Sequence, residues 1–316
     1  MRYVLRADAS QAIGSGHVMR SSAIAEELIS RGHEVIFIGE FSDVPWLFDR
    51  INSLGFLQVF SKSQGFVSHP DTDVLILDSY IVSIDDDFIQ QGKWKGIVAI
   101  VDNVTPPYKA NLLIHPGLAT DWIQISNAKV LAGPRYIPFR KSIKKNHKSS
   151  DKLKVLEILV IGGGTDSFNF VEAICGALKK INGNFHACLF TNTNELAQLD
   201  PRFTALPIGS ELDEHAANAD LVFTTASTTS LEFIVREIAV GIGCAIDNQE
   251  EYYDTLSFAE VASPIGKLIE KNWKIEESRI ASLVQSQEIR DALRKKCGGL
   301  LDLDGAKRIV DEILTL

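Results

Sequence analysis

The 316-residue sequence has few of the features that would assign it directly to a class of protein. Its four cysteines are far apart and show no Cys-x-x-Cys spacing, which argues against a zinc site and fits buried thiols in a reducing cytoplasm. Its seven histidines are scattered, so their spacing predicts no metal cage. The glycine-rich stretch at residues 161–169 lacks the lysine of a P-loop and is therefore no Walker motif. No serine lies in a Gly-x-Ser-x-Gly nucleophile elbow and no cysteine in an activating motif, so nucleophilic catalysis is unsupported.

Long apolar runs and excess positive charge are missing as well. No run approaches the ~20 apolar residues of a membrane-spanning helix, and the start "MRYVLRAD" is unlike a secretory signal. The formal net charge of −9 gives no electrostatic footprint for nucleic acid. We therefore expect a cytoplasmic protein with no nucleic-acid partner and no membrane insertion. The sequence carries no signal for oligomeric state.

The sequence does contain an alternation of apolar strand-like runs and helix-like segments. With 45% hydrophobic residues, 23% charged residues and this length, it suggests a globular protein of about two domains. In the first half, helices are predicted for Val18–Arg31 and for the segment after Asp85. Strands are predicted at residues 3–7, 33–38, 73–78, 96–102 and 111–115, with 129–133 as a further candidate.

The alternation restarts after Lys141–Lys154, a stretch with six lysines that favours a solvated linker over a basic binding patch. Continuous apolar strands separated by helices indicate parallel sheets covered on both faces. The sequence thus predicts an α/β protein of two doubly wound, Rossmann-like domains, residues 1–141 and 142–316. The last helix, with Asp304 as its expected N-cap, is a candidate to pack back on the first domain.

In such sheets ligands bind beyond the carboxyl ends of the strands, so we expect the site in the cleft between the two domains. The first motif there is Gly14-Ser15-Gly16-His17, at a strand-to-helix turn. Glycines allow close backbone approach, and the helix N-terminus attracts anions. It also disfavours imidazolium, so His17 suits a general base, with Arg20 one turn further on. A tight connection with a locally capping or packing histidine is the alternative.

The second domain repeats this pattern at "IGGGTDSFN". Gly163 and Gly164 follow a strand, and Thr165 or Asp166 can cap the next helix. A phosphate cradle and a simple tight turn fit this stretch equally well.

A cluster of small hydroxyl residues follows a later strand of the second domain. Ala226, Ser227 and Thr228 stand at the expected helix start, where hydroxyl and N–H groups suit phosphate. Glu232, in the second turn of the helix, suits a ribose diol. The alternative is an ordinary N-cap followed by a solvent-facing glutamate.

Further polar residues follow two other strands. Asn248 and Gln249 could point their amides into the cleft or merely begin a helix. Asp78 and Tyr80 lie at the end of a first-half strand and would face the cleft too.

With these residues in view, the sequence resembles the family of UDP-2,4-diacetamido-2,4,6-trideoxy-β-L-altropyranose hydrolases of the pseudaminic acid pathway, and the related spore-coat polysaccharide proteins. The resemblance covers roughly Met1–Leu256, and its most specific part is Gly-x-Gly-His-x-x-Arg. It is carried, in order, by "RADASQAIGSGHVMR", "LILDSY", "VDNV", "LAGPRYIPFR", "IGGGTD", "ASTTSLE" and "DNQEE".

The resemblance implies a GT-B-like fold and metal-independent, cofactor-free release of UDP from a UDP-sugar substrate by water, in a pathway that leads to flagellin glycosylation. It implies that His17 is the catalytic base and that Tyr80 and Asn248 line the reaction centre. It further implies that Glu232 holds the uridine ribose and that Ala226, Ser227 and Thr228 form the diphosphate loop. A glycosyltransferase using the same donor and a noncatalytic nucleotide-sugar binder remain the alternatives.

Overall fold

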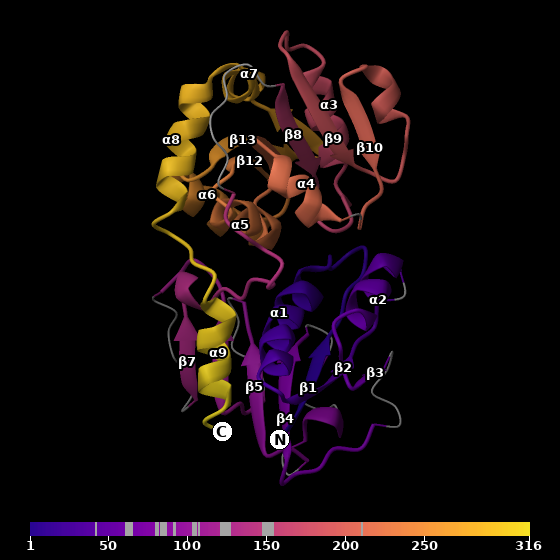
Figure 1. Cartoon of the computed structure of the whole chain (residues 1–316), viewed down its shortest axis with the longest axis vertical. Helices are drawn as coiled ribbons and strands as arrows, with labels where there is room; N and C mark the ends of the chain where they lie inside the picture. The colour runs from indigo at the N-terminus through magenta and orange to yellow at the C-terminus, as the bar shows by residue number, and fades with distance from the viewer. Residues whose placement is uncertain are drawn as a thin grey trace. The chain divides into compact units, whose positions relative to one another are not determined.

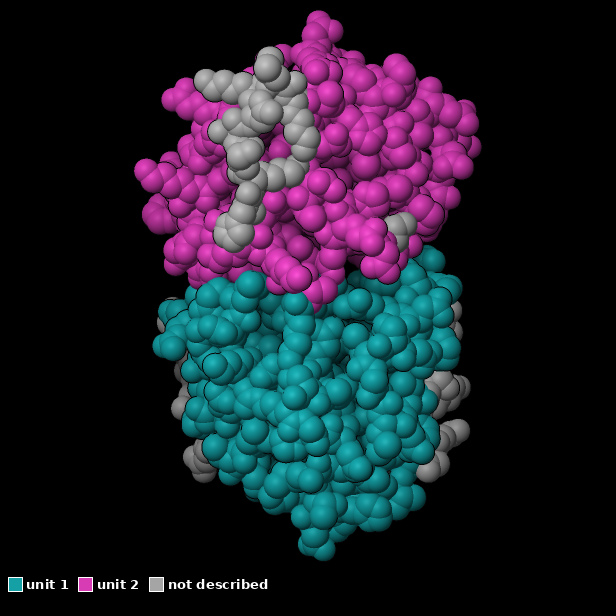
Figure 2. Space-filling model, in the orientation of Figure 1, with its two compact units in different colours: residues 1–141, 302–316 teal, residues 142–301 magenta. Residues whose placement is uncertain are grey.

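The computed structural model divides the chain into two compact units. Unit 1 comprises residues 1–141 and 302–316, and unit 2 comprises residues 142–301 (Figure 2). The structure describes residues 1–41, 43–60, 66–79, 82, 87–90, 93–102, 106, 108–120, 128–146, 155–209 and 211–316.

Unit 1 is built on a seven-stranded sheet in which every pairing is parallel. The strand order is β3-β2-β1-β4-β5-β6-β7, so the direction of winding reverses between β1 and β4. Its strands are β1 (Arg2–Ala7), β2 (Glu34–Ile38), β3 (Gln58–Phe60), β4 (Asp73–Asp78), β5 (Gly96–Ile100), β6 (Leu112–His115) and β7 (Lys129–Ala132).

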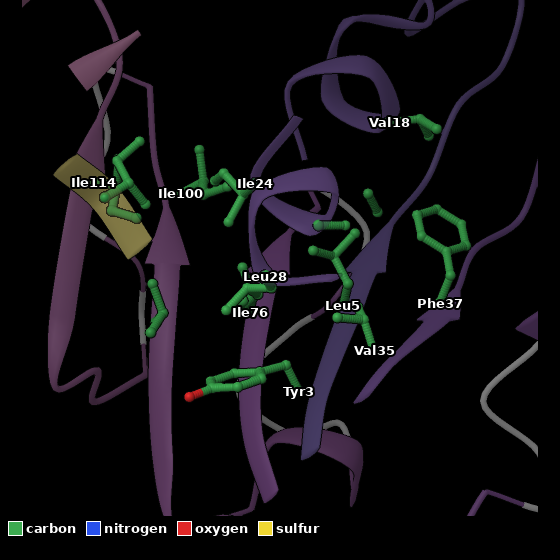
Figure 3. Packing of buried hydrophobic residues seen from close by; sticks show 14 of the residues in the cluster. Tyr3, Leu5, Val18, Ile24, Leu28, Val35, Phe37, Ile76, Ile100 and Ile114 are labelled. Carbon is green, nitrogen blue, oxygen red and sulfur yellow. The ribbon is translucent and has the colours of Figure 1, made fainter. Parts of the chain in front are cut away.

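The largest hydrophobic cluster of unit 1 lies between this sheet and two helices that are far apart in the sequence, α1 (Gly16–Ser30) and α9 (Gly305–Ile313), and the alternate strand residues form a separate cluster with Ile89 and Trp94. Tyr3 and Leu5 of β1 point into the largest cluster (Figure 3). Figure 1 shows α9 beside α1, and the two helices are in contact. The short helix α2 (Pro45–Asn52) follows β2. The C-terminal segment is therefore part of the hydrophobic core of unit 1.

Unit 2 repeats the arrangement with the order β10-β9-β8-β11-β12-β13-β14, so its winding reverses between β8 and β11. Only the edge pairing of β13 with β14 is antiparallel among the pairings described. The strands are β8 (Leu156–Ile161), β9 (Phe185–Phe190), β10 (Phe203–Leu206), β11 (Leu221–Thr225), β12 (Ala239–Cys244), β13 (Ser263–Ile269) and β14 (Asn272–Ile275).

The helices of unit 2 connect these strands and bury apolar side chains against the sheet. Phe170 and Ile174 of α3 pack in its main cluster with Phe223 of β11. The helices are α3 (Phe170–Leu178), α4 (Leu212–Asn218), α5 (Thr228–Val235), α6 (Glu250–Phe258), α7 (Glu277–Gln285) and α8 (Gln287–Cys297).

The predicted fold class, two doubly wound Rossmann-like α/β domains, is confirmed by these two sheets. Of the helix expected after Asp85, the described residues contain only the 3-10 turn Asp87–Ile89, and residues 85–86 and 91–92 lie outside the described part. Asp304 stands at the N-cap of α9 as expected, but its side chain makes no capping hydrogen bond.

The lysine-rich stretch is described only up to residue 146. At its start, Lys141 Nζ lies 3.0 Å from Glu27 Oε2 within unit 1, and Lys145 Nζ lies 2.6 Å from Glu237 Oε1 within unit 2. These first lysines are thus anchored by ion pairs to their own units. Among the described helices, none combines the length and the apolar character needed to cross a membrane.

Candidate functional site

In each unit most of the candidate residues follow the two strands at which the winding reverses; Asn248 and Gln249, which follow β12, are the exceptions. In unit 1 these strands are β1, which leads into His17, and β4, which ends at Asp78. The parallel register pairs Asp78 with Ala7, so both strands end at the same level. Doubly wound sheets bind their ligands at this point because the loops diverge there and leave a crevice.

The loop from β1 to α1 is held by its own hydrogen bonds. Ser10 accepts two of them, from Gly14 N to its carbonyl oxygen at 2.7 Å and from Ile13 N to its Oγ at 3.0 Å. Gly14 has a φ of +84°, which favours glycine. Ser15, the N-cap of α1, makes no capping bond through its side chain. The loop therefore delivers Gly16 and His17 to the first turn of α1 with the helix N-terminus uncapped by that serine.

His17 is buried and forms a short hydrogen bond with Asp78, with Nδ1 2.6 Å from Oδ1. A proton must lie between these atoms, because two unprotonated acceptors would repel each other at that distance. The charged carboxylate accepts, so Nδ1 carries the proton. In the neutral ring the lone pair then belongs to Nε2, and Nε2 is the atom that can take a proton from a reactant.

Arg20, one turn along α1, binds the same carboxylate. Its Nε donates to Asp78 Oδ2 and its Nη2 to Asp78 Oδ1, both at 2.7 Å, and Ser21 Oγ donates to Oδ2 at 3.0 Å. Arg20 Nη1 also donates to Asp102 Oδ1 at 2.7 Å, just beyond β5. Arg20 Nη2 lies 3.1 Å from His17 Nδ1, but since that nitrogen carries its own proton we assign no hydrogen bond there.

In this cluster each charged group stabilises the ionised form of its partner. Burial by itself would raise the pKa of Asp78, but the guanidinium of Arg20 and the hydrogen bonds from Arg20 and His17 outweigh burial and hold that pKa well below its usual range. Burial alone would lower the pKa of Arg20, and the two carboxylates instead raise it well above the usual value. Asp78 is therefore held as a carboxylate, and Arg20 as a guanidinium, at neutral pH.

A second polar cluster fixes the adjoining strand ends. Asp8, directly after β1, accepts from Arg6 Nε at 3.2 Å, from Ser79 Oγ at 2.6 Å and from Glu40 N at 2.9 Å. These bonds connect the ends of β1, β4 and β2 next to Asp78. Tyr80, predicted at the reaction centre, lies outside the described residues.

In unit 2 the glycine turn after β8 is organised around Asp166. Its Oδ1 accepts from Phe170 N at 2.9 Å, so the Asp166 side chain satisfies the first N–H of α3, although the N-cap residue itself is Asn169. A Cβ on Gly162 would lie 1.8 Å from that oxygen, and Gly163 has a φ of +90°. Thr165 Oγ1 lies 2.8 Å from Ser167 Oγ, and Gly164 lies between these anchored residues. A carboxylate thus occupies the N-terminus of α3, which favours the tight-turn interpretation of this stretch.

Asp166 gives a prediction about stability and pH. Burial, with a further contribution from Glu172, raises its pKa to about 6, although the N–H groups of Phe170 and Val171 oppose the shift. The folded chain then binds more protons than the unfolded chain between about pH 4 and 6, so stability falls as the pH rises through that range. Asp166→Asn keeps an acceptor for Phe170 N–H, tolerates the φ of +48° and never ionises.

We expect Asp166→Asn to be more stable than the parent by about 1–2 kcal/mol at pH 7.5, after allowance for partial exposure, and equal to it near pH 4. Urea unfolding followed by circular dichroism at both pH values measures the difference. A parent protein that is the more stable of the two at pH 7.5 would contradict this account of Asp166.

The turn from β11 to α5 differs from the glycine turn because no side-chain carboxylate caps the helix that follows it. Ala226 N donates to Gly243 O at 2.7 Å and Ser227 N to Thr225 O at 2.8 Å, so these two N–H groups are already used. Ser227 is the N-cap of α5 but makes no side-chain capping bond. Helix geometry leaves the next N–H groups, those of Thr228 and Thr229, without intrahelical acceptors. This helix start can offer N–H groups and hydroxyls to an anion, whereas that of α3 already holds a carboxylate.

The remaining predicted residues of unit 2 lie on α5 and at the start of α6. Glu232 is half-buried on α5, in its second turn. Asn248 is exposed in the short turn Asp247–Gln249 before α6. Gln249 uses its Oε1 to accept from Ala245 N at 2.9 Å, so this part of its amide stabilises the turn locally.

Metal and thiol chemistry find no support among the described residues. No group of three or more His, Cys, Asp or Glu side chains is placed there to hold a metal ion. All four cysteines are buried and free, and burial raises the pKa of the Cys175 thiol to about 12.

Asp102, Ser21 and Thr229 were not predicted as site residues. Asp102 belongs to the quoted "VDNV" stretch and directly follows a strand-like run, which was the available signal. Ser21 lies among the small residues of α1 and carried no signal of its own. Thr229 follows the predicted diphosphate loop by one residue, and only the actual start of α5 identifies it.

The comparisons place this fold within a known structural class, the two-domain Rossmann-like α/β proteins. No protein-family model matches the chain, and no curated protein matches its sequence significantly. Among solved structures, the chain is similar to MurG from Acinetobacter baumannii, with a TM-score of 0.66, 14% identity and all of both chains covered.

Two further solved structures show the same likeness. Arabidopsis thaliana UGT89C1, complexed with UDP-L-rhamnose, has a TM-score of 0.64 at 10% identity over 99% of this chain and 98% of its own. A UDP-N-acetylglucosamine 2-epimerase has a TM-score of 0.61 at 12% identity over 98% and 95%. At these identities the likeness establishes the fold.

Proposed function

We propose that the protein hydrolyses a UDP-linked amino-deoxy sugar to the free sugar and UDP. The observation that carries the proposal is the 2.6 Å hydrogen bond between His17 Nδ1 and Asp78 Oδ1 at the switch point of unit 1. It leaves Nε2 of a neutral imidazole as the proton acceptor. The UDP moiety is supported by the structural neighbours, which include a UDP-sugar epimerase and a complex with UDP-L-rhamnose.

In the proposed step, a water oxygen attacks the anomeric carbon while the bond from that carbon to the diphosphate oxygen breaks. UDP leaves with the electron pair of the broken bond, and His17 Nε2 takes the water proton and later releases it to solvent. A single displacement inverts the anomeric configuration. The start of α5, with Thr228 and Thr229, stabilises the negative charge that develops on the leaving diphosphate.

The choice of water as acceptor, of an amino-deoxy sugar and of a role in nonulosonic acid synthesis, such as that of pseudaminic acid, rests on the sequence resemblance. One other reaction, transfer of the sugar to an acceptor, is supported by the fold, because the calicheamicin glycosyltransferase CalG4 has a similar structure. Incubating the protein with a panel of UDP- and CMP-linked amino sugars, first without and then with an acceptor, distinguishes hydrolysis from transfer. Release of UDP at an acceptor-independent rate supports hydrolysis, and release only with an acceptor supports transfer.

The proposed role of Glu232 in holding the uridine ribose predicts a change in KM. Ribose contacts bind substrate and transition state alike, so Glu232→Ala is expected to raise KM about tenfold with kcat nearly unchanged. Glu288→Ala, which removes an exposed carboxylate from the first turn of α8, serves as the matched control. Steady-state kinetics of UDP release measure both, and a lowered kcat at constant KM would remove Glu232 from this role.

A further inference from the structure

Arg20 is buried between two carboxylates and beside the proposed base. Its side chain is 9% exposed, that of Asp78 is 1% exposed and that of Asp102 is 39% exposed. Burying a guanidinium is costly, and its position is maintained only where hydrogen bonds and opposite charges satisfy it.

The hydrogen bonds of Arg20 determine how Asp78 meets the imidazole. Asp78 accepts from Arg20 at both carboxylate oxygens and from Ser21 at Oδ2, so its plane is fixed. The remaining direction on Oδ1 is the one that His17 Nδ1 uses. Asp102 in turn accepts from Nη1 of Arg20 at 2.7 Å and holds the guanidinium against β4. The order of contacts is therefore Asp102, Arg20, Asp78, His17.

The charges of these groups matter as much as their geometry. A lone buried carboxylate against Nδ1 would favour the imidazolium form, which cannot accept a proton from water. The guanidinium offsets that carboxylate at hydrogen-bonding distance. Among the other described titratable groups, Asp102 accepts from Arg20, the pKa of Tyr108 is raised by burial and by the charge of Asp78, and Arg6 pairs with Asp8 at the adjoining strand ends.

We infer that Arg20 is a positioning residue that keeps His17 neutral and in the Nδ1–H tautomer, and that Asp102 positions Arg20. The inference rests on the proposed role of His17 as a base. It assigns a function to the Arg20–Asp102 ion pair, which is connected to His17 through Asp78.

The test is the titration of the His17 ring, followed by long-range ¹H–¹⁵N NMR of the full-length protein, with the His17 signal assigned by its loss in His17→Asn. Arg20→Gln removes the positive charge and is expected to raise the titration midpoint by about one pH unit or more. Asp102→Asn removes a negative charge and is expected to lower it by about half a unit. Arg20→Gln combined with Asp102→Asn is expected to fall between the two single variants.

Shifts of opposite sign are the decisive result, because a merely structural role for the ion pair would not produce them. Midpoints that agree within about 0.2 units in all variants would overturn the inference, and so would shifts of the same sign in both single variants. If Arg20→Gln fails to fold, Asp102→Asn with its partly exposed side chain still tests the sign. Arg20→Lys, which keeps the charge but loses the two-pronged contact, should leave the midpoint near that of the parent.

The kinetic counterpart is the acid limb of the pH profile of kcat/KM for UDP release, which is expected to move in the same direction as the NMR midpoint. NMR needs no turnover, so the two proposals fail separately. Opposite NMR shifts without UDP release from any UDP-sugar would refute the hydrolase and keep the positioning role. UDP release with unchanged midpoints would keep the hydrolase and refute the positioning role of Arg20.

Discussion

Replacing His17 by asparagine is expected to lower kcat for UDP release about 100-fold or more. The imidazole Nε2 is the proposed acceptor of the water proton, and loss of a general base costs a factor of this size. Asparagine can still donate a hydrogen bond to Asp78 Oδ1, so the cluster with Arg20 keeps a partner at that oxygen. The binding of UDP, measured by calorimetry, is expected to stay the same because unit 2 is unaltered.

His33→Asn is the matched control for this substitution. His33 directly precedes β2, so it lies at the amino-terminal end of the parallel strands, opposite to the end at which His17 lies. Its ring is 5.3 Å from that of Tyr3, measured between centroids. Its replacement should leave kcat nearly at the parent value. A His17→Asn variant within threefold of the parent rate would remove His17 from the role of base. If the parent and His17→Asn bind UDP equally and the parent turns over none of the UDP-sugars, the protein is better described as a noncatalytic binder.

Removing two isoleucines from the last helix is expected to have the largest effect on stability. Ile309 and Ile313 of α9 are fully buried in the core that also holds Leu28 and Ile24 of α1. Each truncation to alanine costs about 2–5 kcal/mol through lost burial and an unfilled cavity. Together they approach the whole stability of a typical domain. Ile309→Ala/Ile313→Ala is therefore expected to unfold unit 1 in much less urea than the parent needs.

Lys307→Ala provides the control, because Lys307 is exposed on the same helix and its loss should change stability by no more than about 0.5 kcal/mol. Urea unfolding monitored by tryptophan fluorescence measures all three proteins, and Trp46 and Trp94 report on unit 1. If the double variant unfolds at the urea concentration of the parent, α9 contributes little to the core of unit 1.

Much of the fold could be predicted because the central strands are buried on both faces and are therefore continuously apolar. The runs ending at Ala7 and Asp78 were predicted on this basis, as was the strand before Gly163 and Gly164, and each is a central strand of its sheet. Shorter elements carried too little periodicity. Helix α2 has only eight residues and begins with a proline, and β13 forms an edge hairpin with β14. Helices α4, α7 and α8 and strands β3 and β10 were missed as well.

The candidate site shows where sequence patterns stop being informative. That His17 begins a helix and that Asp78 ends a strand could be predicted from local sequence. Their hydrogen bond depends on the pairing of β1 with β4, which are separated by β2 and β3 in the sequence. The same holds for Arg20, which the helix pattern places one turn from His17 without indicating Asp102 as its partner.

The protonation state of His17 in the parent protein is the most direct test of the mechanism. Long-range ¹H–¹⁵N NMR at pH 7.5 distinguishes the two ring nitrogens by their chemical shifts and proton couplings. The contact with Asp78 predicts that the neutral ring carries its proton on Nδ1, and the charge of Arg20 favours that neutral form, with Nε2 unprotonated. A proton on Nε2, with or without one on Nδ1, would contradict the assignment of His17 as the base that activates water.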